Sequence, residues 1–280
     1  MPQRLMTSVP AAVLMILIGL LPGDSASSRG DTPNPGPDTG AVVALVNASS
    51  PAENLFNGQF CGGVLVSPTL VLTAAHCVRG RRPASVDAVV GADNLCRGAP
   101  VPGQRLHVRT VILHPRTPQG RAVDAALLVL AGKATAAPAR LPDASDRLPA
   151  TGTEFGWGRD GYGGVAPCRR TSVPLRFVPG ERCARAQRNL DIAPDPARQL
   201  CAVPTAEATR NTCTGDSGSP VLAANRVWGL VSWGPSCRID DVGAYVRGAS
   251  LRLWVTGIDA IHSTRRAPAE GTAGNTRGAV

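Results

Sequence analysis

The sequence predicts an all-β fold of the sandwich or barrel type. Short apolar runs rich in Val and Leu recur along the chain, most of them are bounded by Gly, Pro or Asn, and long segments with helical periodicity are rare. With 280 residues and a hydrophobic fraction of 43%, the chain can bury a sizeable core. This composition argues against a mostly disordered protein.

Residues 1–26 are expected to form a secretory signal peptide. Arg4 precedes an apolar stretch over residues 9–21, and small residues suited to cleavage follow it. The stretch is shorter than the roughly 20 residues that span a bilayer, and Pro10 interrupts it, so a retained membrane anchor is less favoured. Residues 27–40, rich in Ser, Pro, Gly and Asp, are expected to form a flexible N-terminal or pro-segment.

Ten apolar runs after residue 40 are expected to form strands: residues 41–46, 63–66, 70–72, 88–90, 106–113, 125–130, 173–178, 220–223, 227–233 and 244–246. Only residues 250–261 are expected to be helical. There, apolar side chains recur at the spacing of one helix face: Leu251, Trp254, Val255, Ile258 and Ile261. Residues 263–280 lack an apolar pattern and are expected to be a disordered tail.

The cysteine content indicates an oxidising compartment. The chain has eight cysteines, and none lies in a CxxC motif or a Cys/His cluster of the zinc type. Four disulfides are therefore the simplest interpretation, and they agree with secretion. No metal ion or organic cofactor is expected.

The net charge of +9 would permit binding to nucleic acid or to an anionic membrane. However, 28 of the 29 basic residues are arginine, which together with abundant Ala, Pro and Gly indicates a GC-rich, actinobacterial-looking genome rather than selection for a basic surface. The arginines are scattered, and no aromatic residues are interleaved with them. Nucleic acid is therefore not an expected partner.

Three segments carry chemically distinctive residues: LTAAHC at 72–77, with His76; VDAALLVL at 123–130, with Asp124; and CTGDSGSP at 213–220, with Ser217. In this order, and together with FCGG at 60–63, GWG at 156–158 and VSWG at 231–234, they resemble the chymotrypsin/trypsin family of serine proteases. The resemblance runs from about residue 41 to 261. It implies one protease domain over residues 41–262, built as two six-stranded antiparallel β-barrels with a C-terminal helix.

The resemblance also implies a role for each of the three residues. Ser217 would attack a peptide carbonyl, and His76 would accept its proton and later deliver it to the leaving amine. Asp124 would hold the imidazole in one tautomer and stabilise its protonated form.

The same resemblance implies that the backbone N–H groups of Gly215 and Ser217 form an oxyanion hole for the tetrahedral intermediate. His107, His114 and His262 lack this sequence context. They are expected to be ordinary surface or packing histidines.

The resemblance pairs six of the cysteines as Cys61–Cys77, Cys183–Cys201 and Cys213–Cys237. Cys96 and Cys168 do not match the commonest pairs of the family. Their loops could be neighbours in this fold, so a fourth disulfide is expected between them, with a free thiol on each as the alternative.

The first departure from the family concerns the N-terminus. The mature chain in this family normally begins with an Ile-Val-Gly-Gly-like segment, whose freed amino group pairs with the Asp beside the nucleophile. Asp216 is present here, but no such segment precedes residue 41. A buried carboxylate needs a counter-charge. Cleavage of a zymogen after Arg29, signal-peptidase cleavage near Ala26 and an internal arginine are the open sources, and a processed N-terminus is expected.

The second departure concerns the substrate pocket, to which the resemblance assigns five residues: Asn211, Ser232, Trp233, Gly234 and Gly243. Asn211 occupies the floor position, where trypsin-like enzymes have Asp. A neutral floor disfavours a buried Arg or Lys side chain, so a preference for uncharged residues such as Leu, Met, Phe, Tyr or Gln is expected. Asp240 and Asp241 could instead lean a carboxylate into the pocket.

The sequence therefore predicts a secreted serine endopeptidase that works through an acyl-enzyme intermediate and is not strictly specific for Arg or Lys. Its expected partners are protein or peptide substrates and proteinaceous protease inhibitors. It is expected to be a monomer without stable membrane insertion after processing. Two alternatives remain at this stage: a catalytically silent binding protein on the same fold, and a basic protein that binds an anionic polymer.

Overall fold

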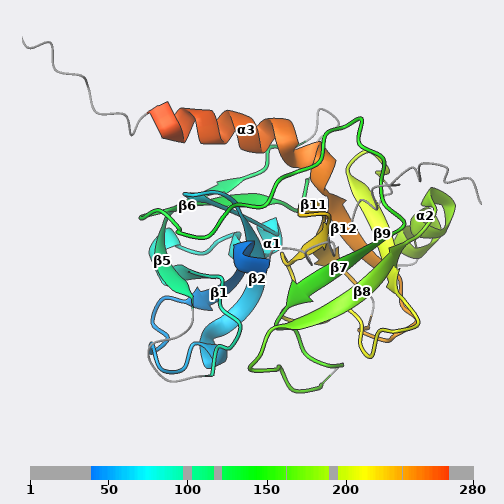
Figure 1. Cartoon of the computed structure of the whole chain (residues 1–280), viewed down its shortest axis with the longest axis horizontal. Coiled ribbons are helices and arrows are strands. Elements are labelled where there is room, and N and C mark those ends of the chain that lie inside the picture. Colours follow the sequence, from blue (N-terminus) through cyan, green and yellow to red (C-terminus); the bar gives the residue numbers. More distant parts are fainter. Residues whose placement is uncertain are drawn as a thin grey trace, which may run out of the picture. The chain divides into compact units, whose positions relative to one another are not determined.

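Two closed six-stranded antiparallel β-barrels, joined in one chain, form the protein (Figure 1). The structure, a computed structural model, describes residues 39–96, 103–116, 122–161, 163–188, 195–234 and 236–264. The predicted signal peptide, Arg29 and almost all of the predicted tail lie outside these residues. The predicted fold class is confirmed.

The first barrel has the strand order β1-β2-β3-β6-β5-β4. Its strands are β1 (Val42–Asn47), β2 (Gln59–Ser67), β3 (Leu70–Thr73), β4 (Val86–Val90), β5 (Gln104–Leu113) and β6 (Ala126–Leu130). The second barrel has the order β10-β11-β12-β9-β8-β7. Its strands are β7 (Thr151–Gly156), β8 (Thr171–Phe177), β9 (Gln199–Pro204), β10 (Pro220–Ala223), β11 (Arg226–Trp233) and β12 (Gly243–Arg247).

The core is made chiefly of Val, Leu and Ala, as the low aromatic content requires. Strands β3, β4 and β6 are buried along their whole length, because one face fills the barrel and the other is covered by neighbouring segments. Strand β7 instead alternates between exposed and buried positions. Its sequence TGTEFG contains two glycines and a glutamate, so it lacks the apolar run by which strands were predicted.

Three α-helices lie among the described residues: α1 (Ala75–Val78), α2 (Gly180–Arg188) and α3 (Gly248–Thr264). Short 3₁₀ helices span Thr39–Ala41, Phe56–Gly58 and Pro83–Ser85. Helix α3 leaves the second barrel after β12 and runs over the first (Figure 1). Within the described part of the chain, no helix has the length and apolar character needed to cross a membrane.

All ten predicted strands are present, with ends that differ by a few residues, but the sequence did not predict β7, β9, α1 or α2. Helix α2 was missed because its exposed face is charged and only two of its side chains, Cys183 and Gln187, are buried. A 3₁₀ helix spans Thr39–Ala41, at the end of the segment expected to be flexible, and α3 extends to Thr264, three residues past the predicted end of the helix.

The structure contains four disulfides, and they join the expected pairs: Cys61–Cys77, Cys96–Cys168, Cys183–Cys201 and Cys213–Cys237. Cys96 follows β4 in the first barrel, whereas Cys168 lies between β7 and β8 in the second. Backbone hydrogen bonds flank this bridge, including one from Leu95 N–H to the Cys168 carbonyl at 2.9 Å. This disulfide therefore ties the two barrels together.

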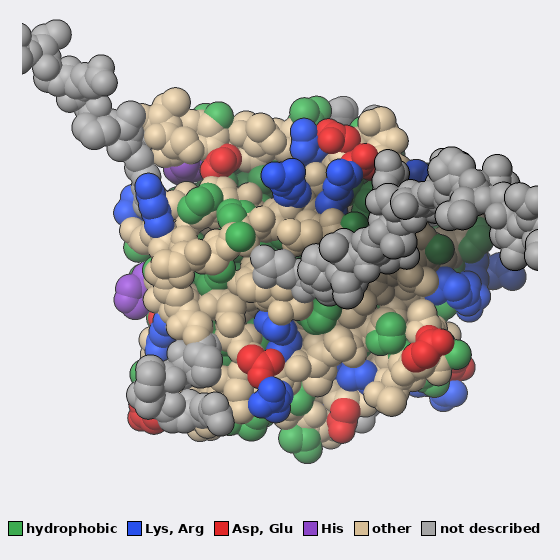
Figure 2. Space-filling view, in the orientation of Figure 1, with side chains coloured by type: hydrophobic (Ala, Val, Ile, Leu, Met, Phe, Trp, Pro, Cys, Tyr) green, Lys and Arg blue, Asp and Glu red, His purple; other side chains and the backbone are tan. Residues whose placement is uncertain are grey.

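Basic side chains do not form one continuous band on the face shown in Figure 2. Lys and Arg side chains of the described residues lie there in small groups with acidic side chains between them. Elsewhere among the described residues, ion pairs also join the two kinds of charge, for example Arg252 on α3 with Asp143. On this face, the net charge is thus distributed rather than concentrated.

Candidate active site

His76 and Asp124 form a directly bonded pair. His76 lies on α1, in the first barrel, and Asp124 precedes β6 by two residues. The ring Nδ1 of His76 is 2.8 Å from Asp124 Oδ2, and the backbone N–H of His76 donates to Asp124 Oδ1 at 2.9 Å. The carboxylate thereby fixes the orientation of the ring. Because Nδ1 faces the carboxylate, Nε2 is the nitrogen that remains available as a base.

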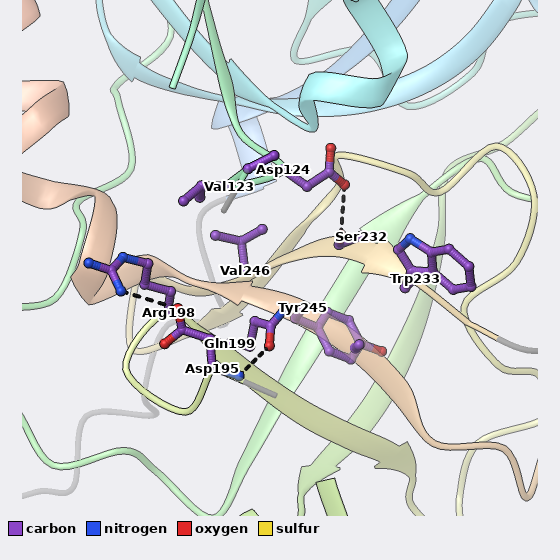
Figure 3. Close-up of a pocket in the computed structure, with 11 residues that line it drawn as sticks. Val123, Asp124, Asp195, Arg198, Gln199, Ser232, Trp233, Tyr245 and Val246 are labelled. Carbon is purple, nitrogen blue, oxygen red and sulfur yellow. Dashed lines mark hydrogen bonds and ion pairs between the residues drawn. The ribbon is translucent and has the colours of Figure 1, made fainter. Parts of the chain in front are cut away.

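A third donor supports the Asp124 carboxylate. The hydroxyl of Ser232 on β11 donates to Oδ2 at 2.6 Å, and Figure 3 shows this side chain pointing at the carboxylate. Burial opposes ionisation of Asp124. The hydrogen bonds and charge of His76, together with the Ser232 hydroxyl, outweigh it and lower the pKa of the carboxyl below its usual value. Asp124 is therefore ionised and ready to stabilise a protonated imidazole.

Ser217 lies in the loop before β10, in the second barrel. Its carbonyl accepts a hydrogen bond from Gly62 N–H at 2.8 Å, which fastens the loop to the first barrel. Gly215 and Gly218 on either side have φ values of +100° and +81°, which L-residues with a side chain rarely adopt. Neither Gly215 N–H nor Ser217 N–H donates to an acceptor in the described part of the chain.

His76 and Ser217 line one cavity of about 490 Å³ at the junction of the barrels. All five predicted pocket residues line it as well: Asn211, Ser232, Trp233, Gly234 and Gly243. A second cavity of about 290 Å³ shares Ser232 and Trp233 with the first, and Asp124 lies on its wall (Figure 3). The predicted site residues, which are distant in the sequence, are thus brought together.

Neighbouring backbone groups form hydrogen bonds with both ends of the Asn211 amide. Its Nδ2 donates to the carbonyls of Arg238 at 2.7 Å and Asp241 at 3.1 Å, and its Oδ1 accepts from Thr212 N–H at 2.8 Å. The carboxylate of Asp241 also lines the cavity, where it accepts hydrogen bonds from the Ser236 hydroxyl and the Arg238 N–H. The pocket therefore presents the amide of Asn211, which is already hydrogen-bonded, and Asp241, whose carboxylate is hydrogen-bonded to Ser236 and Arg238.

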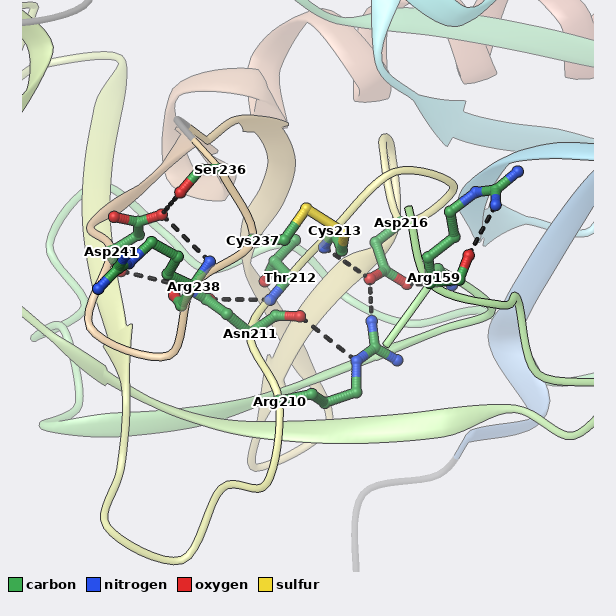
Figure 4. Close-up of a disulfide and its surroundings, with 12 residues drawn as sticks. Arg159, Arg210, Asn211, Thr212, Cys213, Asp216, Ser236, Cys237, Arg238 and Asp241 are labelled. Atoms are coloured by element: carbon green, nitrogen blue, oxygen red, sulfur yellow. Dashed lines mark hydrogen bonds and ion pairs between the residues drawn. A yellow bond between two sulfur atoms is a disulfide. The ribbon is translucent and has the colours of Figure 1, made fainter. Parts of the chain in front are cut away.

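The carboxylate beside the nucleophile has an internal partner. Asp216 is fully buried, and its Oδ2 forms an ion pair with Nη2 of Arg210, whose side chain is also buried (Figure 4). Of the three sources of counter-charge left open by the sequence, the structure contains the internal arginine. Sequence reasoning did not single out Arg210. Its position, six residues before Asp216 and next to Asn211, was the available signal.

One cluster of potential metal ligands lies at the site: Cys61, His76 and Cys77. Cys61 and Cys77 are joined in a disulfide, so neither sulfur is a thiolate that could bind a metal ion. The cluster thus does not have the chemistry of a metal site. His107 also pairs with an aspartate, Asp87, but His107 does not line the cavity that His76 shares with Ser217. His114 packs edge-on against Trp254.

Comparison with known proteins agrees with this geometry. The family model Trypsin matches residues 30–255. A trypsin of Saccharopolyspora erythraea is 34% identical over 197 residues, which is 68% of this chain and 82% of that protein. Trypsin zeta of Drosophila erecta is 30% identical over 78% of this chain and 80% of that protein.

Solved structures give the same answer for the fold. The Vibrio cholerae VesB protease has a TM-score of 0.65 and 28% identity, covering 79% of this chain and 64% of that one. Human heparin binding protein also has a TM-score of 0.65, at 22% identity, covering 80% of this chain and 92% of that one, and at this identity it supports the fold alone. With the family match, the identity to trypsins and the two-barrel fold in agreement, the chain belongs to the trypsin family of serine proteases.

Proposed function

We propose that the protein is a secreted serine endopeptidase whose catalytic residues are His76, Asp124 and Ser217. The observation that carries the proposal is the His76–Asp124 pair, 2.8 Å from nitrogen to oxygen, in a cavity that His76 shares with Ser217. A serine hydroxyl is a poor nucleophile until a base removes its proton, and an imidazole held by a carboxylate is such a base.

The reaction proceeds in two halves. Ser217 Oγ bonds to the carbonyl carbon of the substrate while its proton moves to His76 Nε2. The C–N bond then breaks as His76 protonates the leaving amine, which leaves an acyl-enzyme that water hydrolyses by the reverse proton movements. The N–H groups of Gly215 and Ser217 stabilise the oxyanion in both halves, since neither has an acceptor within the described part of the chain.

The substrate enters as an extended peptide, with the side chain before the cut in the 490 Å³ cavity and earlier residues along Ser232, Trp233 and Gly234. No organic cofactor takes part in these steps. Secretion as a soluble monomer, with a signal peptide over residues 1–26, is part of the same proposal. The even cysteine count and the four disulfides support the secretion.

The proposed specificity is for uncharged side chains such as Leu, Met, Phe, Tyr or Gln. Asn211 is uncharged, and its NH₂ group and one lone pair of Oδ1 are already hydrogen-bonded, whereas a buried cation without a carboxylate partner is costly. A panel of peptides that differ only at the residue before the cut should show these residues cleaved best. If Arg and Lys peptides are cleaved best, Asp241 is the residue expected to pair with the basic side chain, and Asp241→Asn should remove the preference. Asn211→Asp is a poorer test, because its carboxylate would face two carbonyls.

The test of the function is covalent labelling with a fluorophosphonate, together with peptide hydrolysis. The wild-type protein should be labelled and active. Ser217→Ala should lose labelling, and both Ser217→Ala and His76→Ala should lose hydrolysis by several orders of magnitude. Ser172→Ala, which removes an exposed hydroxyl on β8, is the matched control and should behave as wild type. Equal hydrolysis by wild type and Ser217→Ala would refute the proposed mechanism.

A further inference from the structure

The charge balance around Asp216 departs from what the family resemblance implies. The residue adjoins Ser217, in the segment that carries both proposed oxyanion donors. Its Oδ1 accepts a hydrogen bond from Gly158 N–H at 2.7 Å, and its Oδ2 accepts one from Cys213 N–H at 3.0 Å. These bonds position the carboxylate but leave its charge to be balanced, because the side chain is completely buried.

Arg210 supplies that charge from the segment between β9 and β10. Its side chain is only 8% exposed, and Nη2 pairs with Asp216 Oδ2. Nη1 donates to the hydroxyl of Thr171 at the start of β8, and Nε donates to the Asn211 carbonyl at 3.3 Å. Figure 4 shows the guanidinium group aimed at Asp216. Three polar interactions, one from each guanidinium nitrogen, thus fix the orientation of the arginine.

We propose that Arg210 is a positioning residue for catalysis: its guanidinium takes the place of a freed N-terminal amino group and holds residues 215–217 in the competent geometry. The inference rests on the proposed peptidase function. It implies that the chain is active without proteolytic release of a new N-terminus. Cleavage after Arg29 would create a new N-terminus at residue 30, where the family match begins, but activity would not require that cleavage.

A second buried carboxyl lies in the same cluster. A Cβ built on Gly156 would be 2.3 Å from Asp216 Oδ1 and 2.7 Å from Glu154 Oε1, so both oxygens crowd the same point. Arg210 is the basic group that pairs with this cluster among the described residues. Burial and the neighbouring Asp216 raise the pKa of the Glu154 carboxyl well above its usual value. The raised pKa favours the protonated form of Glu154, which would leave one carboxylate for Arg210 to balance. Burial also raises the pKa of Asp216, and the guanidinium of Arg210 opposes that rise.

The first arm of the test replaces the arginine. Arg210→Gln should lower kcat about 100-fold, the order of effect of losing an oxyanion-hole donor, while KM changes less than about threefold. Arg210→Lys, which keeps the charge, should recover at least about tenfold of the loss. Arg159→Gln is the matched control. It removes an exposed arginine whose backbone N–H bonds the same loop at Thr214 but whose side chain contacts Gly164. It should retain wild-type kcat.

The second arm does not depend on how Arg210 variants fold. The tested chain is secreted, carries a tag ahead of residue 27 and has the substitution Arg29→Gln. Intact-mass measurement confirms that the tag is retained. The rate at which fluorophosphonate labels this chain is then compared with the rate for wild type. Labelling within about twofold supports the inference, whereas labelling only after trimming of the N-terminus overturns it. Wild-type kcat in folded Arg210→Gln also overturns it. Failure of the proposed function looks different, because wild type and Ser217→Ala would then be equally inactive.

Discussion

At the scale of single residues, the least expected feature is two buried carboxyl groups, those of Glu154 and Asp216, with one arginine, Arg210, as their basic neighbour. Asp216 accepts two backbone hydrogen bonds and pairs with Arg210. No backbone N–H in the described part of the chain donates to Glu154, whose side chain is completely buried. Burial and the neighbouring Asp216 raise its pKa well above the usual value, which favours the protonated form in the folded protein. Since the unfolded chain would ionise it, Glu154 makes stability depend on pH.

The sign of this dependence is fixed by the direction of the shift. The folded-state pKa of Glu154 lies above its unfolded value near 4.5, so the folded state holds an extra proton between the two values. Stability therefore falls as pH rises through that window. Glu154→Gln keeps the shape and removes the ionisation. We expect its melting temperature to exceed that of wild type at pH 8 and to match it near pH 4.

Thermal denaturation followed by circular dichroism at the two pH values measures this difference. Glu181→Gln, which changes an exposed glutamate on α2, is the control and should not show the pH-dependent gain. A Glu154→Gln protein that melts below wild type at pH 8 would mean that the glutamate is ionised and paired in the folded state.

At the scale of elements, α3 shows how far amphipathic spacing can be trusted. Leu251 and Val255 are buried, and Trp254 and Ile258 pack against the core, as the spacing predicts. Ile261, predicted on the same face, is 48% exposed. Ile261 lies in the last turn of the helix and is only about half covered. Periodicity identifies a face, whereas burial also requires a partner.

Two leucines on α3 make a matched test of this packing. Leu251 is 0% exposed and Leu253 is 87% exposed, although both lie in the same helix. Leu251→Ala should lower the free energy of unfolding by about 2–5 kcal/mol, the usual cost of a buried leucine. Leu253→Ala should change it by less than about 0.5 kcal/mol. Urea denaturation of both variants measures the difference, and similar losses would mean that α3 does not dock on the barrels as described.

At the scale of the whole molecule, the site depends on both barrels. His76 and Asp124 come from the first barrel, and Ser217 and its pocket come from the second. The Cys96–Cys168 disulfide joins the two barrels, and an ion pair between Asp93 and Arg169 lies beside it. The alignment of the proposed catalytic residues is therefore expected to depend on this bridge more than on a disulfide within one barrel.

Replacing both cysteines of a bridge by serine tests this expectation. The chain-entropy model gives about 4 kcal/mol for the 72-residue separation of Cys96–Cys168 and about 3 kcal/mol for the 18-residue separation of Cys183–Cys201. We expect the first double variant to unfold at lower urea and to lose more kcat/KM than the second. If the Cys183–Cys201 variant is the more impaired, control of the site by the bridge between barrels is excluded.

What the sequence determined by itself is carried by short motifs and local patterns. Runs of Val and Leu predicted ten strands, because an apolar run between turn residues has few other stable outcomes. His76, Asp124 and Ser217 were identifiable because each lies in a distinctive motif of a few residues. The pocket residues were assigned by the resemblance to the family, which places Asn211 at the floor.

Only the tertiary structure decided how residues from separate segments share a buried space. The bonds that occupy Asn211 and the hydroxyl of Ser232 on Asp124 have no local sequence signature, and the pairing of Arg210 with Asp216 has only the weak signal of its position. Arginine is the commonest charged residue in this chain, so its abundance hides the one that is buried beside Asp216. The energy of such a contact depends on desolvation and orientation, and both are set by the topology of the barrels rather than by neighbours along the chain.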